Sequence, residues 1–88
     1  MKALIFANSN DQRSSASKIA QLKKNLAANG IQIELIDSNS TDGSQRAGNY
    51  DIMSYPALAL VREDGAVQGV WQVDLPDYAS ISQSSGHI

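Results

Sequence analysis

The chain is 88 residues long, which is the size of one small domain, and a chain of this length buries only about 60 to 65% of its unfolded surface. It contains no cysteine and one histidine, His87, which excludes disulfides, thiol chemistry and metal sites built from cysteine or several histidines. Its formal net charge is -2 at pH 7, and no apolar run is long enough for a signal peptide or a membrane span. We therefore expect a cytoplasmic protein that has no membrane contact and no cofactor.

The charges are unevenly distributed along the chain. Up to Gly30 there are five basic residues and one acidic residue, whereas the remainder has two basic and eight acidic residues. Three lysines, Lys18, Lys23 and Lys24, fall on one predicted helix, but no aromatic residues alternate with them as on a surface that binds nucleic acid. We interpret them as a solvated helix face and expect no nucleic-acid partner.

The first third of the chain predicts a strand, a loop and a helix. Residues 1–7 are almost entirely apolar, as in a strand covered on both faces, and Asn8 to Ser15 is predicted to be a polar loop. From Ser14 or Ser15 the pattern becomes helical. The apolar face of this helix consists of Ile19, Leu22 and Leu26. Asn29-Gly30 supplies its C-terminal stop, where Gly30 is expected to adopt the left-handed conformation.

The middle of the chain predicts a half-exposed strand and a weak helix. Residues 31–37 alternate, with Ile31, Ile33 and Leu35 on one face and Gln32 and Glu34 on the other. The segment that follows is rich in serine, asparagine and glycine, and its one helical signal is Asp42-x-x-Gln45 as a capping pair.

The last third predicts a hairpin and a short helix. Residues 57–61 are a second fully apolar run, and Asp64-Gly65 favours a primed turn into an antiparallel strand over Ala66 to Val73. Val67, Trp71 and Val73 fall on one face of that strand and Gln68 and Gln72 on the other. Leu75-Pro76-Asp77 opens a final short helix, anchored by Leu75, Tyr78 and Ile81. The domain is therefore expected to span residues 1–81, and 82–88 to form a flexible tail.

The two strands that are apolar on both faces are the first and the third, so they should lie in the middle of the sheet. The sequence thus predicts a four-stranded mixed sheet in the order 2-1-3-4, with helices covering both of its faces. The predicted fold class is α/β with the element order β-α-β-α-β-β-α.

The segment Ile52-Met53-Ser54-Tyr55-Pro56, followed by an apolar strand and an Asp-Gly hairpin, resembles a loop of the thioredoxin-like superfamily in which a cis-proline packs against the active-site dithiol. The resemblance covers residues 1–81 and implies a three-layer α/β/α fold with a cis Tyr55-Pro56 bond. In thioredoxins and glutaredoxins a Cys-x-x-Cys motif begins the first helix, where this chain has Ser14-Ser15-Ala16-Ser17-Lys18. A serine hydroxyl cannot replace a thiolate as a redox couple, which excludes disulfide oxidoreductase activity.

The resemblance leads to the hypothesis of a non-redox binding module. Its groove, between the helix start at Ser14 to Ser17 and the Tyr55-Pro56 loop, would take a peptide, a protein or a small anionic ligand. Unpaired helix N-H groups favour anions, and proline leaves the backbone of Tyr55 free to pair with an extended strand. The candidate ligand-binding residues are Arg13, Ser14, Ser17, Lys18, Tyr55 and Pro56. We predict no catalytic residue and no metal ligand, and we expect a monomer.

Three alternatives remain open on the sequence. One is a glutathione-transferase-like domain in which Ser14 or Ser17 binds a thiolate, although such transferases carry a second, helical domain for which this chain has no room. Another is a Cys-to-Ser form of a thiol-disulfide oxidoreductase. The third is a structural domain that assembles through its exposed edge strand at Val67 and Trp71.

Overall fold

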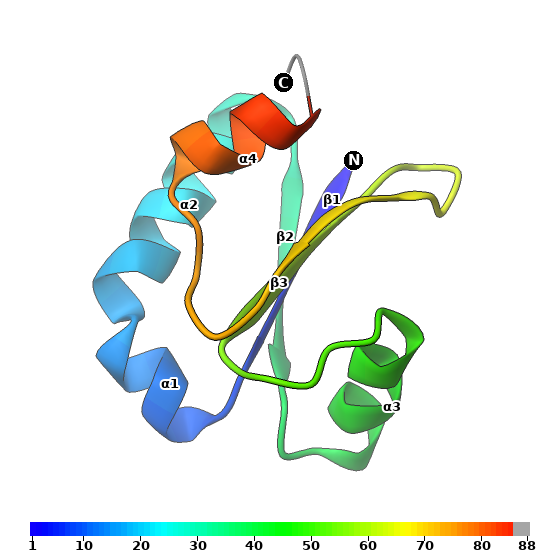
Figure 1. Ribbon diagram of the computed structural model, residues 1–88. Helices are drawn as coiled ribbons and strands as arrows, with labels where there is room; N and C mark the ends of the chain where they lie inside the picture. The colour runs from blue at the N-terminus through cyan, green and yellow to red at the C-terminus, as the bar shows by residue number, and fades with distance from the viewer. Residues whose placement is uncertain (86–88) are drawn as a thin grey trace.

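The two strands expected to be apolar on both faces lie at the centre of the sheet. The computed structural model describes residues 1–85, with side chains described up to residue 81. These residues form a four-stranded sheet in the order β2-β1-β3-β4 (Figure 1). The strands are β1 (Lys2–Ala7), β2 (Gln32–Asp37), β3 (Ala57–Val61) and β4 (Val67–Trp71), and the helices are α1 (Ser9–Ser14), α2 (Ala16–Ala28), α3 (Thr41–Asn49) and α4 (Tyr78–Ser85).

The pairing of β1 determines the direction of the other strands. It runs parallel to β2, with Lys2 opposite Gln32, and antiparallel to β3, with Phe6 opposite Ala57. Residues 3–7 and 57–60 are all buried, as strands with helices on both sides must be. The predicted mixed sheet and its order 2-1-3-4 are confirmed.

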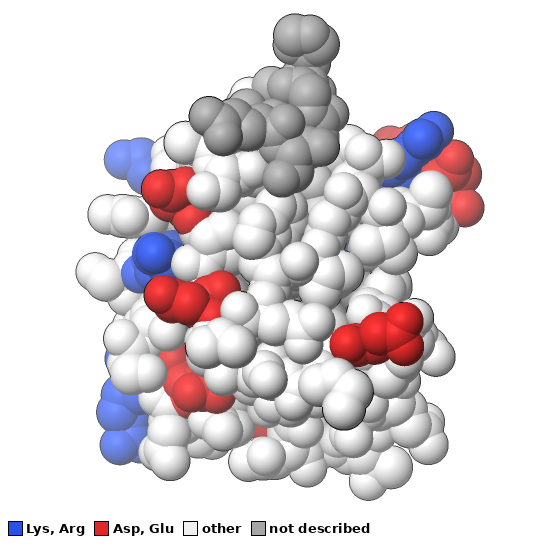
Figure 2. Space-filling model, viewed as in Figure 1, with Lys and Arg blue, Asp and Glu red and all other residues white. Residues whose placement is uncertain are grey.

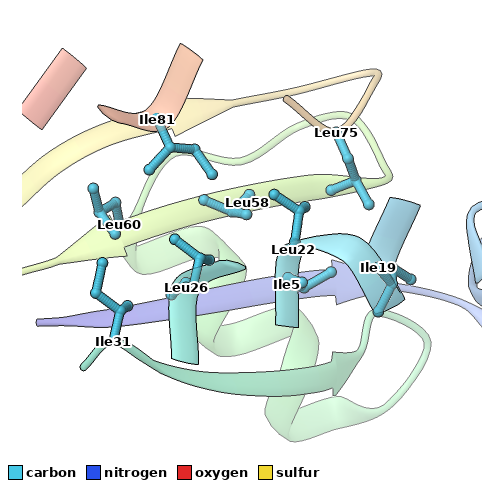
Figure 3. Close-up of a cluster of buried hydrophobic side chains, with 10 residues drawn as sticks. Ile5, Ile19, Leu22, Leu26, Ile31, Leu58, Leu60, Leu75 and Ile81 are labelled. Atoms are coloured by element: carbon cyan, nitrogen blue, oxygen red, sulfur yellow. The ribbon is translucent and has the colours of Figure 1, made fainter. Parts of the chain in front are cut away.

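The helices cover the two faces of the sheet in separate layers. In Figure 1, α2 and α4 lie on one side of the sheet and α3 lies on the other. The α2-side core contains Ala3, Ile5, Ile19, Leu22, Leu26, Ile31, Leu58, Leu60, Leu75 and Ile81 (Figure 3). The α3-side core contains Leu4, Phe6, Ile36, Ala47, Ile52, Ala57 and Ala59. The alternation of side chains along β1 and β3 supplies both cores, which confirms the three-layer arrangement.

The end of α2 has the geometry that its sequence predicts. Gly30 has φ +77°, and its N-H donates to the carbonyl of Ala27 at 3.0 Å. The N-H of Ile31 reaches the carbonyl of Leu26 at 2.9 Å, and both of these side chains are buried in the α2-side core. This pair of bonds, together with the apolar contact, is a Schellman motif.

The segment from Asn8 to Ser15 was expected to be a loop, and this expectation is wrong. Residues 9–14 form the short helix α1, because the side chain of Asn8 accepts a hydrogen bond from the N-H of Asp11 at 2.8 Å and caps the first turn. The amide of Gln12 also donates to the carbonyl of Ala7 at 3.0 Å, which ties the helix to the end of β1. No residue of α1 is buried, so no apolar period marks it in the sequence.

The strand β2 differs from its predicted half-exposed pattern at two positions. Ile36, on the face expected to be wet, is buried in the α3-side core because α3 covers it. Leu35, on the face expected to be buried, is 37% exposed at the open edge of the sheet.

The strand β4 is shorter than predicted. It ends at Trp71, and a bulge interrupts its pairing with β3 between Leu60 and Val61. Val73 lies outside the strand with φ +77° and is 68% exposed, so it does not share a buried face with Trp71. Of the two turn residues, only Gly65 has a positive φ, so the hairpin closes through the N-H of Gly65 on the carbonyl of Arg62 rather than through a primed turn.

Two helix boundaries also differ. The N-cap of α3 is Ser40, whose hydroxyl accepts from the N-H of Gly43 at 2.9 Å, instead of the predicted pair of Asp42 and Gln45. Helix α4 continues to Ser85, past the expected end of the domain at residue 81. The rest of the expected tail, residues 86–88, lies outside the described residues.

Candidate functional site

The serines predicted to begin a free helix lie at a break between two helices. Ser15 separates α1 from α2. Its N-H donates to the carbonyl of Asp11 at 2.9 Å, and its carbonyl accepts a hydrogen bond from the N-H of Ile19 at 2.9 Å. The hydroxyl of Ser14 donates to the carbonyl of Asp11 at 3.3 Å, and the side chain of Ser15 makes no capping bond. The helix α2 therefore begins within the predicted Ser14 to Ser17, with Ser15 as its N-cap, and α1 directly precedes it.

Lys18 has a structural partner. Its Nζ donates to the carbonyl of Leu75 at 3.2 Å, which links α2 to the segment before α4. The pKa of Asp77 is lowered by the backbone and side-chain hydrogen bonds from Ser80, with a smaller contribution from the charge of Lys18. Arg13 and Ser17, the other candidates on this side, are exposed.

The Tyr55-Pro56 loop lies at the start of β3. The peptide bond between the two residues is cis, and the partly buried ring of Tyr55 packs against the α3-side core. Within residues 1–85, Tyr55 makes no hydrogen bond through its backbone or its hydroxyl.

The neighbouring residues of the loop are held by the segment that follows β4. The side-chain oxygen of Gln72 accepts hydrogen bonds from the N-H groups of Met53 at 2.8 Å and Ser54 at 3.2 Å. Beside this anchor, the side chain of Met53 is 85% exposed and that of Val73 is 68% exposed. Two large apolar side chains therefore face solvent next to the unpaired backbone of Tyr55.

The segment 72–75 connects the two halves of the predicted groove. Gln72 binds the loop at one end, and the carbonyl of Leu75 binds Lys18 at the other. No hydrogen bond or ion pair joins Ser14 or Ser17 to Tyr55 or Pro56 in the described part of the chain. Sequence reasoning missed Gln72 and Val73 as site residues; the only signal was a polar residue at the end of an apolar strand.

Figure 2 shows the face seen in Figure 1 with its charges. Most of this face is uncharged, with acidic groups standing apart from one another, whereas basic groups gather along the side where α2 lies.

A network of ion pairs lies away from this loop, around Glu34 of β2. Glu34 forms a bidentate pair with Arg46 of α3 at 2.6 and 3.2 Å and a second ion pair with Lys2 at 2.8 Å. The hydrogen bonds from Arg46 and then Lys2 lower the pKa of Glu34 to about 2. The same pairing raises the pKa of Arg46 above its ordinary value. These residues tie α3 to the edge of the sheet.

Residues 1–85 contain no cluster of three side chains suited to hold a metal ion. None of the described helices has the length and hydropathy that crossing a membrane requires. His87 lies outside the described residues.

A comparison with protein families finds no match, and a comparison with curated proteins finds none either. Among solved structures, the chain is similar to thioredoxin 1 of Thermosipho africanus TCF52B, with a TM-score of 0.67 and 16% identity over 96% of this chain and 89% of that one. It is also similar to the oxidoreductase DsbH, with a TM-score of 0.69 and 14% identity over 97% of this chain and 72% of that one. The chain has the thioredoxin-like fold and lacks the dithiol, because it contains no cysteine.

Proposed function

We propose that the chain is a non-redox binding module of thioredoxin-like fold that binds an extended, apolar peptide segment at the Tyr55-Pro56 loop. The observation that carries the proposal is the backbone of Tyr55, which makes no hydrogen bond within residues 1–85. Tyr55 lies between Ser54, which Gln72 holds together with Met53, and the start of β3. An incoming strand can pair with this backbone, and the pairing gives affinity that does not depend on sequence.

Exposed apolar groups favour a peptide as the ligand. Met53 and Val73 flank the loop and are the two most exposed large apolar side chains in the described part of the chain. Methionine is flexible and polarizable, so it adapts to different apolar side chains. Exposed apolar surface next to an unpaired backbone segment is typical of a site for an extended ligand.

The small anionic ligand has less support than the peptide. Its expected binding group was the helix start at Ser14 to Ser17, which follows directly on α1 with only Ser15 between the two helices. Of the two expected cations, Lys18 already binds the carbonyl of Leu75, and Arg13 is exposed. The glutathione-transferase-like alternative depended on the same serines, and the hydroxyl of Ser14 is bound within its own helix.

The test is selection of peptides from a displayed random library on the intact protein, followed by affinity measurements on a synthetic copy of a selected peptide. We expect Met53→Asp to weaken binding at least about tenfold, because it places a charge in an apolar contact. The matched control is Val67→Asp, at an apolar side chain that is 46% exposed on β4; it should bind as the wild type does.

Amide chemical-shift changes on titration locate the site independently. Changes confined to residues 53–56 and 72–74 support the proposal. Changes centred on residues 67–71, with Val67→Asp losing affinity, would transfer the function to β4. A wild-type protein that retains no peptide from the library contradicts the proposal.

A further inference from the structure

The open edge of β2 is regular, whereas that of β4 is not. β2 pairs with β1 without a break from Gln32 to Asp37, and no strand formed by residues 1–85 lies on its other side. β4 carries the bulge opposite Leu60 and Val61, a device that discourages pairing with another chain. Of the two edges, β2 is the one suited to accept a further strand.

The β2 edge also carries an apolar projection and an apolar hollow. The projection is Leu35, 37% exposed on the face of the sheet that α2 covers. The hollow is an open pocket of about 630 Å³ at the start of the strand. Its apolar lining comes from Ala27, Ile31 and Ile33, and its rim is formed by Lys2, Lys23, Gly30, Gln32 and Glu34. Leu35, Ile33 and Ile31 lie on the same face because side chains alternate along a strand.

We propose that two copies of this chain pair through the β2 edge, antiparallel and about a two-fold axis at Ile33. In this register Ile33 faces Ile33 of the second copy, and Leu35 faces Ile31 of the second copy on both sides of the axis. Each Leu35 enters the hollow of the other copy. The same projection and the same hollow of the chain therefore form both contacts of the symmetric interface. This is the self-complementarity that a two-fold interface requires.

The charges on the opposite face of β2 are compatible with this pairing. Gln32 lies across from Glu34 of the second copy, so an amide meets a carboxylate. Glu34 is already neutralised by Lys2 at 2.8 Å and Arg46 at 2.6 Å. Two copies of Glu34 therefore approach the axis without a large repulsion.

One strand pair and two leucine contacts make a small interface. Interfaces at the low end of the size range form weak, transient complexes. The dimer is therefore expected to depend on concentration, and the expectation of a monomer from the sequence describes only the dilute protein.

The first test is sedimentation equilibrium of the full chain from about 10 μM to about 1 mM, the range in which weak complexes form. The wild type should pass from monomer to dimer. Leu35→Lys should raise the dissociation constant at least about tenfold, because it removes the projection from both subunits. Val67→Lys, on the other edge strand, should leave the constant unchanged, and an unaltered melting curve shows that each variant is folded. A monomer at every concentration, or a dimer lost in Val67→Lys and kept in Leu35→Lys, overturns the proposal.

The second test reads the register and uses the absence of cysteine from the chain. In Ile33→Cys the two thiols face each other across the axis, within the distance that a disulfide spans. In Leu35→Cys they are separated along the strands by four residues, beyond that distance. Mild oxidation at high protein concentration should therefore give a covalent dimer with Ile33→Cys and little with Leu35→Cys. The reverse result, or equal and slow cross-linking of both variants, overturns this register.

Discussion

Two glycines of α3 have opposite roles. A Cβ on Gly43 would overlap the backbone carbonyl oxygen of Asp37, whereas a Cβ on Gly48 would have no atom within 4 Å. Gly43→Ala should therefore destabilise the protein by about 1 to 3 kcal/mol, because backbone must move to relieve the contact. Gly48→Ala should stabilise it by about 0.5 to 1 kcal/mol, because alanine favours the helix. Urea denaturation of the two variants measures both effects, and a Gly43→Ala protein as stable as the wild type would show that α3 does not approach Asp37 this closely.

The ends of α2 and α3 form the same motif with different residues. Gly30 follows α2 with φ +77°, and Asp51 follows α3 with φ +56°. At the end of α3, the N-H of Ile52 binds the carbonyl of Ala47 at 3.0 Å and the N-H of Asp51 binds that of Gly48 at 3.2 Å. A non-glycine residue is strained in this left-handed position.

This difference predicts that adding a side chain at position 30 and removing the side chain at position 51 change the stability of the protein in opposite directions. Gly30→Ala should destabilise the protein by about 1 kcal/mol, and Asp51→Gly should stabilise it by about 0.5 to 1 kcal/mol. Thermal or urea unfolding measures the pair. If Asp51→Gly lowers the stability, the aspartate side chain contributes more to the native state than its strained backbone costs.

At the scale of the elements, the pairing of Glu34 with Arg46 and Lys2 joins α3 and β1 to β2. The pKa of Glu34 falls from its ordinary value of 4.5 to about 2 in the folded protein. A group with a lowered pKa stabilises the fold above its unfolded pKa, and this contribution is lost as the pH falls towards the folded value. Because the side chain is 36% exposed, solvent reduces the contribution to about 1 kcal/mol or less.

We therefore expect Glu34→Gln to be less stable than the wild type at pH 7 and equally stable near pH 2, with the difference disappearing between about pH 4.5 and 2. The measurement is the free energy of unfolding in urea as a function of pH. The matched control is Glu63→Gln, at a side chain that is 93% exposed, which should follow the wild-type curve. A difference that persists at pH 2 would mean that glutamine disturbs the packing rather than the charge pair.

At the scale of the whole molecule, the sheet order was predictable because the apolar pattern of each strand indicates how many of its faces are buried. Two fully apolar runs, residues 3–7 and 57–60, had to occupy the centre. Helix α2 was predictable for a similar reason, since three buried side chains repeat at its period. In each case one local pattern carried the information.

The features that the sequence did not predict have a different physical origin. Helix α1 depends on the side-chain contacts of Asn8 and Gln12, and asparagine is equally common in loops. Val73 has a positive φ that a β-branched residue rarely adopts, so its propensity predicted the strand to continue. The contact of Gln72 with the backbone of Met53 joins segments that only the folded chain brings together. The candidate site is built from contacts of this kind, which is why only its Tyr55-Pro56 part was visible beforehand.

Trp71 is the only tryptophan of the chain, and its ring packs against the α2-side core. A Cβ on Gly69 would come within 2.8 Å of that ring, so the glycine leaves the space in which the indole lies. The intrinsic fluorescence of Trp71 therefore reports on the layer formed by α2 and α4. Circular dichroism reports the helices of both layers. Denaturation followed by the two signals together distinguishes a molecule that unfolds in one step from one whose two faces come apart separately.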